Sequence, residues 1–389
     1  MTAGPPDPIP GQTSTGSKRA EALFGGLPGP RVMVRSEGCR VWDDEGRAYL
    51  DMGMALGAVA LGYGHPAVVA AVAEAARGGG ISSLPPVHEH ALAERLLPWV
   101  PGGEAVRFHK TGAEGVAAAV RLARVVTGRD AVLTCGYHGW LDWCQECPGV
   151  PEADRLLHRP LRFNDAADLE AALGERDAPA AIVIEPVVED PPDPAWLAHV
   201  RRRATEVGAA LIFDEIKTGV RFGVGGAAGR YGVTPDAVVL GKALGNGLPI
   251  AAVVGSRDLL DAATRTWISS TLATETLALA GALAVLDVCE GTDALALLQE
   301  AGGEWLAGCR EVAARWPQVV TEVRGVREFS FLRFATAETS AAVASAAARR
   351  GVLVRRGPYN FPSSAHAGAD VRTALERLAD AVAEVAARC

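Results

Sequence analysis

One of the chain's four lysines lies in a sequence context that suits a reactive amine. Lys242 follows an apolar run, 237–240, and is surrounded by glycines in the segment Gly-Lys-Ala-Leu-Gly-Asn-Gly, 241–247. Glycine has no Cβ, so another group can approach the ammonium closely. Partial desolvation lowers the pKa of a lysine and supplies the neutral amine that imine formation needs. Lys242 is therefore the first candidate for covalent chemistry.

Two further segments carry groups that bind charge. In 108–115 a glycine-bearing turn opens a helix, and its free N–H groups and helix dipole suit a phosphate, with Lys110 expected to pair with that phosphate. The segment matches neither the Walker pattern nor G-x-G-x-x-G, and an ordinary strand–helix turn is the alternative. In 211–219 an apolar strand delivers the carboxylates of Asp214 and Glu215 to its C-terminal end, where open sheets place their ligands. Acids that merely cap a strand end are the alternative there.

The elements that position these residues alternate between strand and helix. Helices are predicted at 114–127 and 194–207, and apolar strands at 131–134, 181–184, 210–213 and 237–240. Apolar strands separated by helices indicate an α/β fold whose sheet is covered on both faces. A phosphate site, a carboxylate and a lysine would then meet at the C-terminal edge of one sheet. Pyridoxal phosphate needs these three groups, because the lysine forms a Schiff base, the carboxylate keeps the ring nitrogen protonated, and the helix N-terminus binds the phosphate.

The remaining pattern completes the large domain and predicts a second, smaller one. A hairpin is expected at 32–51, helices at 66–77 and 87–99, a long helix after Thr274, and a final helix from Asp370 onward. We therefore expect a flexible tail or extended arm at 1–30 and an N-terminal segment of the small domain at 31–60. The large domain is expected at 61–288 and the C-terminal small domain at 289–389.

Composition argues against several other classes of protein. The 389 residues include 38 Lys and Arg against 46 Asp and Glu, and this balance disfavours nucleic acid or an anionic membrane as the main partner. The longest stretch without charged residues, 52–73, is interrupted by a Gly- and Pro-containing turn and predicts no membrane span. Seven cysteines without a signal-peptide pattern favour reduced thiols in the cytoplasm. Cys144 and Cys147 lack a second pair at zinc-site spacing, so no metal is expected.

Six motifs occur in an order that resembles a known family. From about Gly38 to the C-terminus the chain resembles class III pyridoxal-phosphate-dependent aminotransferases, with the glutamate-1-semialdehyde aminomutase branch most similar. This resemblance implies fold type I, which is aspartate aminotransferase-like, with a mostly parallel sheet between helices and a smaller α+β domain. The motifs are Gly62-Tyr63-Gly64-His65-Pro66, Thr111-Gly112-Ala113-Glu114, Gly136-Tyr137-His138-Gly139, Ile184-Glu185-Pro186, Phe213-Asp214-Glu215-Ile216, and Gly232-Val233-Thr234-Pro235-Asp236 leading to Gly241-Lys242.

The resemblance implies a role for each matched residue in catalysis. Lys242 would form the Schiff base with the cofactor and then move a proton between the substrate carbon and the cofactor. Asp214 would pair with the pyridine nitrogen. Tyr137 would stack on one face of the ring and Ile216 would pack against the other. Two further residues would support the site: His138 and Glu185.

The resemblance also implies how the phosphate is held. Gly112 and Ala113 would bind it through their backbone N–H groups. Ser270 and Thr271 match a Gly-Thr pair that reaches the phosphate from the neighbouring subunit. The site would therefore be complete only in a homodimer, in which each subunit contributes to the other's cofactor site.

The chain departs from the family pattern at four places. Ala113 replaces the usual Thr of the phosphate loop. Lys217 stands where many relatives carry Gln, either beside the cofactor's phenolic oxygen or, since strand side chains alternate, facing outward. The segment 25–31 has no counterpart of the aminomutase Ser-Pro-Val-Arg. A shortened Arg-Arg-Gly-Pro-Tyr-Asn, 355–360, replaces the usual Phe-Glu-Ala-Gly, and Arg355 or Arg356 could bind a donor carboxylate or lie at the surface.

Three functions are consistent with these features. The first is an aminotransferase that moves an amino group from an amino-acid donor to an aldehyde or ketone, with the carbonyl of a neutral sugar or cyclitol as one acceptor class. The second is an isomerase on the same scaffold, either a glutamate-1-semialdehyde 2,1-aminomutase or an amino-acid racemase. The third is a non-catalytic binding protein that keeps the fold, which joint retention of Lys242, Asp214 and Tyr137 disfavours.

Overall fold

A computed structural model describes residues 7–175 and 177–388, and it divides into two compact units. One unit is continuous, 65–295, and the other combines the chain up to residue 64 with the chain from residue 296 onward. Among the described residues no helix is both long and apolar enough to cross a membrane. The Lys242 motif and both charge-binding segments belong to the continuous unit.

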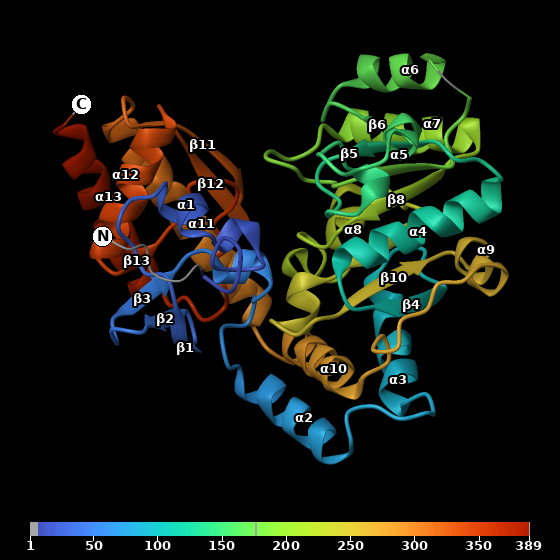
Figure 1. Cartoon of the computed structure of the whole chain (residues 1–389), viewed down its shortest axis with the longest axis horizontal. Coiled ribbons are helices and arrows are strands. Elements are labelled where there is room, and N and C mark those ends of the chain that lie inside the picture. The colour runs from blue at the N-terminus through green and yellow to red at the C-terminus, as the bar shows by residue number, and fades with distance from the viewer. Residues whose placement is uncertain (1–6, 176, 389) are drawn as a thin grey trace. The chain divides into compact units, whose positions relative to one another are not determined.

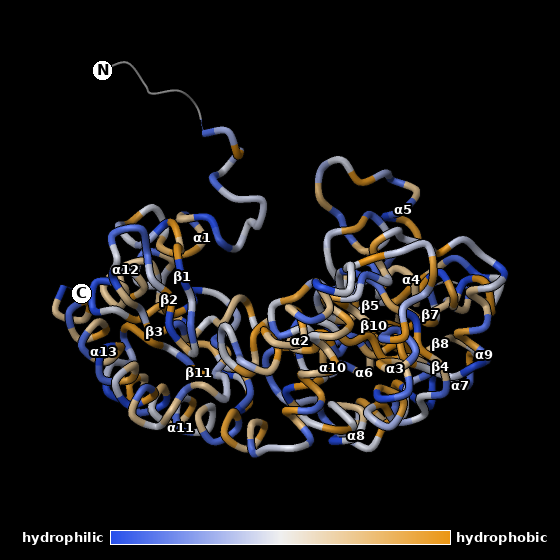
Figure 2. Tube along the Cα trace, turned by 90° about the horizontal axis from the view of Figure 1, so that it is seen from below, coloured by the Kyte–Doolittle hydropathy of each residue, from blue (hydrophilic) through white to orange (hydrophobic). Residues whose placement is uncertain are grey.

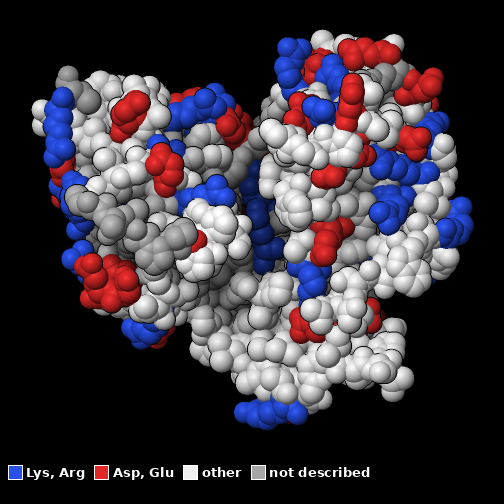
Figure 3. Space-filling view, viewed as in Figure 1, with Lys and Arg blue, Asp and Glu red and all other residues white. Residues whose placement is uncertain are grey.

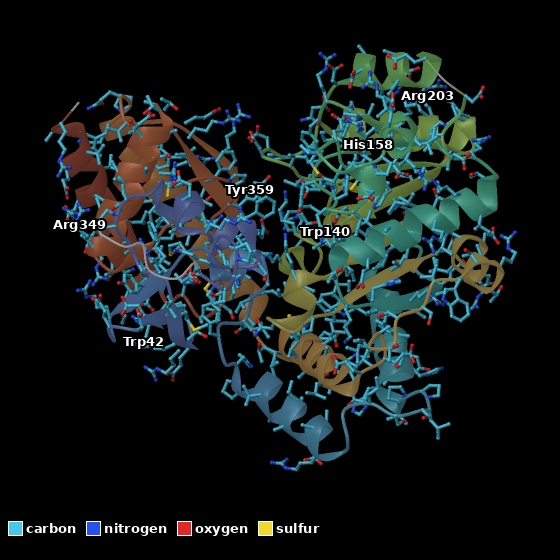
Figure 4. The ribbon with its side chains drawn as sticks, in the orientation of Figure 1. Trp42, Trp140, His158, Arg203, Arg349 and Tyr359 are labelled. Carbon is cyan, nitrogen blue, oxygen red and sulfur yellow. The ribbon has the colours of Figure 1, made fainter. Side chains whose placement is uncertain are left out.

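The continuous unit is built on a seven-stranded sheet with the strand order β4-β10-β9-β8-β7-β5-β6 (Figure 1). The strands from β9 through β6 are parallel, whereas β10 is antiparallel to both of its neighbours. His158 on the edge strand (labelled in Figure 4) hydrogen-bonds through Nε2 to Thr134 Oγ1 at 2.6 Å. The strands are β4 (Ala105–His109), β5 (Val132–Cys135), β6 (His158–Pro160), β7 (Ala181–Ile184), β8 (Ala210–Asp214), β9 (Ala237–Leu240) and β10 (Ala251–Gly255).

Helices cover this sheet as the apolar strands require. Figure 2 shows the strands largely in the hydrophobic colour, with α4 on one side of them and α8 on the other. The side chains of α4 form one buried cluster with those of the strands β7, β8, β9 and β10. The helices are α2 (Pro66–Arg77), α3 (Val87–Leu96), α4 (Gly112–Thr127), α5 (Glu152–Leu157), α6 (Ala166–Glu175), α7 (Pro194–Val207), α8 (Gly226–Tyr231), α9 (Arg257–Leu260) and α10 (Thr276–Gly291). The expectation of an α/β fold with a mostly parallel sheet between helices is confirmed.

Local sequence signals explain where two helices of this unit begin and end. Thr111 caps α4 in a reciprocal capping box with Glu114, and Gly128 ends the helix in the left-handed conformation. Asp193 caps α7 by accepting a hydrogen bond from Ala195 N at 2.8 Å, and Gly208 ends it in the same way as Gly128. These signals fix the helices within the chain, and the apolar faces then determine how they pack.

The other unit holds a four-stranded sheet of order β1-β2-β3-β13 and a two-stranded sheet of β11 and β12. Its core surrounds the fully buried Trp305, and Tyr359 (Figure 4) packs edge-on against Phe329. The segment 7–30 is not extended throughout, because residues 20–24 form a short helix whose Phe24 is buried against Ala344. The elements are α1 (Ala20–Phe24), β1 (Met33–Glu37), β2 (Arg40–Asp43), β3 (Ala48–Asp51), α11 (Ala294–Arg315), β11 (Val320–Val326), β12 (Phe329–Phe334), α12 (Ala337–Arg349), β13 (Val352–Leu353) and α13 (Gly368–Ala386).

Candidate active site

Sheet topology brings the predicted site residues to one edge. The strands β5, β7, β8 and β9 are parallel neighbours, with Ile184 opposite Phe213 and Asp214 opposite Val239. Their C-terminal ends therefore lie at the same edge, which is where open α/β sheets bind ligands. The strand β4 leads into α4 at this edge too, because β10 is antiparallel to both β4 and β9. Side chains separated by more than a hundred residues in sequence meet there.

Asp214 is a buried carboxylate held by two donors. Its Oδ2 lies 2.9 Å from His138 Nδ1, and its Oδ1 accepts a hydrogen bond from Ile216 N at 3.2 Å. Both Asp214 and His138 are almost completely buried. A carboxylate fixed in this way can hold a proton on a heteroaromatic nitrogen without rotating, since its own orientation is already determined.

Lys242 supplies an amine to the same edge. Its backbone has φ of +44°, a left-handed conformation that costs free energy for a residue other than glycine and that occurs disproportionately at functional sites. Burial lowers the pKa of Lys242, and the positive charges of Lys217 and Arg221 lower it further, against the opposing effect of Glu185 and Asp214. Among the described residues, none forms a hydrogen bond or ion pair with Lys242 Nζ. Burial therefore favours the neutral, nucleophilic form of this amine.

The start of α4 offers an anion site of backbone donors. Thr111 Oγ1 accepts the Glu114 N–H at 3.2 Å, whereas the N–H groups of Gly112 and Ala113 have no acceptor in the described part of the chain. A Cβ on Gly112 would lie 2.3 Å from Ile216 Cδ1, so only glycine fits this close approach. Two free amides and the positive end of a sixteen-residue helix suit a phosphate dianion.

The residues expected to enclose a ring lie around this space. Ile216 contacts the turn at Gly112 and packs near Gly241, which precedes Lys242. Tyr137 follows β5 with a side chain that is 65% exposed, so its ring is available for stacking. Trp140 (Figure 4), also exposed, comes from the same loop. Ala113 lies against Gly139, where an added Cβ would be 2.5 Å from the Ala113 Cβ, so both residues of this contact must be small.

Two of the four lysines have partners that differ from expectation. Lys217 does not face outward: β8 ends at Asp214, strand alternation stops there, and the Lys217 side chain is only 4% exposed. Its Nζ donates to Glu185 Oε2 and to the Val188 carbonyl, each at 3.1 Å. Lys110 does not reach for a phosphate either, because its Nζ pairs with Glu275 Oε1 at 2.5 Å.

The two residues expected to reach the phosphate of a neighbouring subunit differ from the buried site residues in their exposure. Ser270 and Thr271 have exposed side chains in the loop before α10, and no hydrogen bond joins those side chains to the Asp214–His138 pair in the described residues. This exposure is what a contribution to a partner subunit would require. The assignment of both residues stays a prediction.

The arginines 355 and 356 belong to the other unit and have different surroundings. Arg356 donates to Ser340 Oγ, to the Glu21 carbonyl and to the Ala337 carbonyl, so its guanidinium is engaged within the fold. Arg355 lines a cavity of about 460 Å³ together with Asp51, and its buried Nε has no partner among the described residues. None of the residues around Lys242 lines this cavity. The candidate active site is therefore the sheet edge that carries Lys242 and Asp214.

Glu215 is a buried carboxylate whose role the strand-end pattern did not distinguish from that of Asp214. It accepts hydrogen bonds from Ala227 N at 2.6 Å, Ala228 N at 2.8 Å and Thr218 Oγ1 at 2.9 Å. Burial raises its pKa, while these donors lower it. Glu215 therefore fastens the start of α8 and is structural, whereas its neighbour Asp214 faces the site.

We expect the replacement Glu215→Ala to reduce the free energy of unfolding. Two buried N–H groups lose their acceptor, and each unsatisfied donor costs about 1–3 kcal/mol. Urea unfolding followed by circular dichroism measures the loss. The control Glu74→Ala removes an exposed side chain and should change stability by less than about 0.5 kcal/mol. Equal stability of the Glu215→Ala protein and the wild type would contradict the structural role.

The sheet order and the site together define a class of protein. A mostly parallel sheet with one antiparallel strand, carrying a lysine, a buried carboxylate and free helix-start amides at one edge, is the architecture of a fold type I pyridoxal-phosphate enzyme. The residues fit that cofactor, since an amine with no partner among the described residues, a fixed carboxylate and open amides match its aldehyde, ring nitrogen and phosphate.

Comparison with known proteins gives the family. The model of the family "Aminotransferase class-III" matches residues 26–145 and 157–382. The chain belongs to the class-III aminotransferases, which makes it an enzyme that uses pyridoxal 5'-phosphate. A 2'-deamino-2'-hydroxyneamine transaminase of Streptomyces kanamyceticus is 39% identical over 285 residues, covering 70% of each chain.

Two further comparisons bear on fold and function. A glutamate-1-semialdehyde 2,1-aminomutase of Roseiflexus castenholzii is 37% identical over 319 residues, covering 76% of this chain and 73% of the relative. The solved structure of the PLP internal aldimine form of the Sphingopyxis sp. MTA144 FumI protein superimposes with a TM-score of 0.90 at 26% identity, covering 95% of this chain and 92% of that one. Transaminase and aminomutase relatives thus occur side by side.

Proposed function

We propose that the enzyme transfers an amino group from an amino-acid donor to the aldehyde or ketone of a neutral sugar or cyclitol. The observation that supports this proposal is the amine of Lys242. It has no partner among the described residues and lies at the sheet edge that also holds Asp214. In this reaction the donor becomes a 2-oxo acid and the acceptor carbonyl becomes an amine, so no external oxidant is needed. The cofactor, when bound, supplies the electron sink for the negative charge that develops at the substrate carbon.

The chain's own residues divide the work between binding and proton transfer. Lys242 Nζ would hold the cofactor through its aldehyde and would take the proton from the substrate carbon. Asp214 holds the proton on the ring nitrogen, and His138 fixes the orientation of that carboxylate through the 2.9 Å contact. Gly112 and Ala113 N–H groups bind the phosphate.

Three more residues complete this proposal. Tyr137 would hold one face of the cofactor ring, and Ile216 would hold the other. Glu185 supports the site from the neighbouring strand, where its backbone N–H donates to the Cys135 carbonyl at 2.8 Å. The packing of Ile216 near both Gly112 and Gly241 supports its assignment.

The choice of acceptor rests on the segments the chain lacks. The aminomutase segments Ser-Pro-Val-Arg and Phe-Glu-Ala-Gly have no full counterpart here, which removes groups expected to hold a second carboxylate. The similarity to a 2'-deamino-2'-hydroxyneamine transaminase supports an acceptor of the same kind. An isomerase is the second candidate, supported by the 37% identical aminomutase.

A single-substrate experiment separates these two functions. The holoenzyme is mixed with one amino compound at a time and no carbonyl acceptor. A transaminase should stop after one equivalent of 2-oxo acid per site, whereas an isomerase should turn over repeatedly. The stalled enzyme is then offered sugar, cyclitol and 2-oxo-acid carbonyls, and the compound that restores the visible absorption identifies the acceptor class. Sustained turnover on one substrate would contradict the transaminase proposal.

We also propose that two copies of the chain share each site. Exposed apolar side chains lie on the segment from the end of α2 to the first residue of α3 and on the loop before α10, and these segments meet where Thr276 N donates to the Gly80 carbonyl at 2.7 Å. The surface of α2 and α10 in Figure 3 is largely free of charge. An exposed apolar patch rimmed by polar residues is typical of a protein interface. The exposed side chains are Ile81, Leu84, Val87, Trp267 and Leu272.

Replacing Thr271 by Ala is expected to weaken cofactor retention without unfolding the protein. The phosphate would lose one hydroxyl donor from the partner subunit, and Ala113 has already replaced another. One hydrogen bond to a charged group contributes about 1.5–3 kcal/mol, so we expect roughly a tenfold or greater rise in the dissociation constant. Cofactor release on dialysis measures this, with Ser269→Ala as the exposed control. A fully active, cofactor-loaded monomer in sedimentation would contradict the shared site.

A further inference from the structure

Two lysines and two carboxylates share the buried end of the sheet, and only one lysine is paired. The Lys217 ammonium donates to Glu185 Oε2 at 3.1 Å and to the Val188 carbonyl at 3.1 Å. The Asp214 carboxylate forms a hydrogen bond with His138 Nδ1. Within the described residues Lys242 Nζ forms no hydrogen bond or ion pair, so both carboxylates near it are already engaged by other groups.

This division of partners has an electrostatic consequence. A buried carboxylate without a cation is costly, and it would draw the nearest ammonium toward it. Glu185 is one of the groups that raise the pKa of Lys242, and Lys217 is one of those that lower it. The charged groups that face Lys217 are Glu185 and Glu189 from the loop after β7, Asp214 at the end of β8 and Lys242 after β9.

We propose that Lys217 is a positioning residue that holds the Glu185 carboxylate, so that Lys242 remains a neutral amine. This inference rests on the proposed function of Lys242 as the cofactor lysine. A neutral residue at position 217 would leave the Glu185 charge without this cation, and Glu185 already favours the protonated form of Lys242. The contact with Lys217 also holds the Glu185 side chain beside Gly136. A Cβ added at Gly136 would lie 2.8 Å from Glu185 Cβ.

The test compares single and double variants of the holoenzyme. Borohydride reduction and peptide mapping first establish that the cofactor is attached to Lys242 in the wild type. The pH midpoint of the cofactor's visible absorption is then measured for Lys217→Met, Lys217→Gln and the double variant Lys217→Met/Glu185→Gln. Circular dichroism confirms that each variant is folded, and Lys217→Gln serves as the second neutral replacement if Lys217→Met does not fold.

The sign of the expected shift follows from the charges. Removing the Lys217 cation leaves a nearby carboxylate, which favours the protonated nitrogen of Lys242, so the midpoint should rise by about 1 pH unit or more. Removing the Glu185 charge as well should return the midpoint to near the wild-type value. A midpoint that does not rise in the single variants overturns the proposal.

A rise that persists in the double variant overturns it too, because Lys217 would then act on the cofactor directly rather than through Glu185. Attachment of the cofactor to another lysine in the wild type would instead refute the proposed function of Lys242. The two failures are therefore distinguishable. Because the readout is a spectroscopic titration, a merely structural effect on turnover does not imitate the expected result.

Discussion

Replacing Lys242 by Ala is expected to abolish covalent attachment of the cofactor and to reduce turnover on the order of 10³-fold or more. The variant loses both the amine that holds the cofactor and the base that moves the proton at the substrate carbon. Phosphate-anchored cofactor should still bind, because the N–H groups of Gly112 and Ala113 are unchanged. The measurements are the visible spectrum, cofactor content after gel filtration, and the rate of 2-oxo-acid formation.

The matched control for this experiment is Lys18→Ala, which removes an exposed lysine of the other unit and should leave spectrum and turnover unchanged. Borohydride reduction of the wild type followed by peptide mapping identifies the attached lysine independently. A pyridoxyl group on Lys110 or Lys217 would refute the assignment. The structure already makes both poor candidates, since each ammonium is paired with a carboxylate.

Replacing Asp214 by Asn is expected to reduce turnover by about 10²–10³-fold while leaving the protein folded. Asn has nearly the same shape and can still accept the Ile216 N–H, but it carries no negative charge to keep the ring nitrogen protonated. The electron sink of the cofactor is then weakened, although the phosphate and Lys242 still hold it. Turnover and cofactor content of the purified variant give the result.

The control for the Asp214 variant is Asp142→Asn, which changes an exposed carboxylate in the loop after β5. It should retain wild-type turnover. Full activity of the Asp214→Asn enzyme would show that the buried carboxylate does not serve the ring nitrogen. A further readout is the pH dependence of turnover, because loss of the Asp214 charge should alter it and a change in folding stability alone should not.

Local sequence was sufficient to predict the elements whose apolar runs or end signals lie within the element itself. The apolar runs at 181–184 and 237–240 are the strands β7 and β9, and Pro194 with Gly208 bounds α7 as expected. These signals are local because backbone conformation and capping depend on near neighbours. Local sequence did not predict the edge strand β6 or the antiparallel strand β10, because a short strand is defined by the partner with which it pairs.

Side-chain pairing could not be predicted in the same way. Strand alternation favours an outward-facing Lys217, but the strand ends three residues earlier and the chain turns the lysine inward to Glu185. Lys110 was expected at a phosphate and instead pairs with Glu275 at the start of α10. Both partners are distant in sequence, so only the packing of separate elements brings them within ionic contact.

The sequence by itself determined the chemistry available to this protein: one lysine among glycines, a carboxylate at the end of an apolar strand, and a helix-opening turn. These depend on residue type and local conformation. Only the tertiary structure decided how the charges are distributed among them. Parallel strands bring Glu185, Asp214 and Lys242 to one edge, where low solvent access strengthens the interactions between charged groups. Lys217 and His138 take the two carboxylates, and Lys242 is left as the free amine.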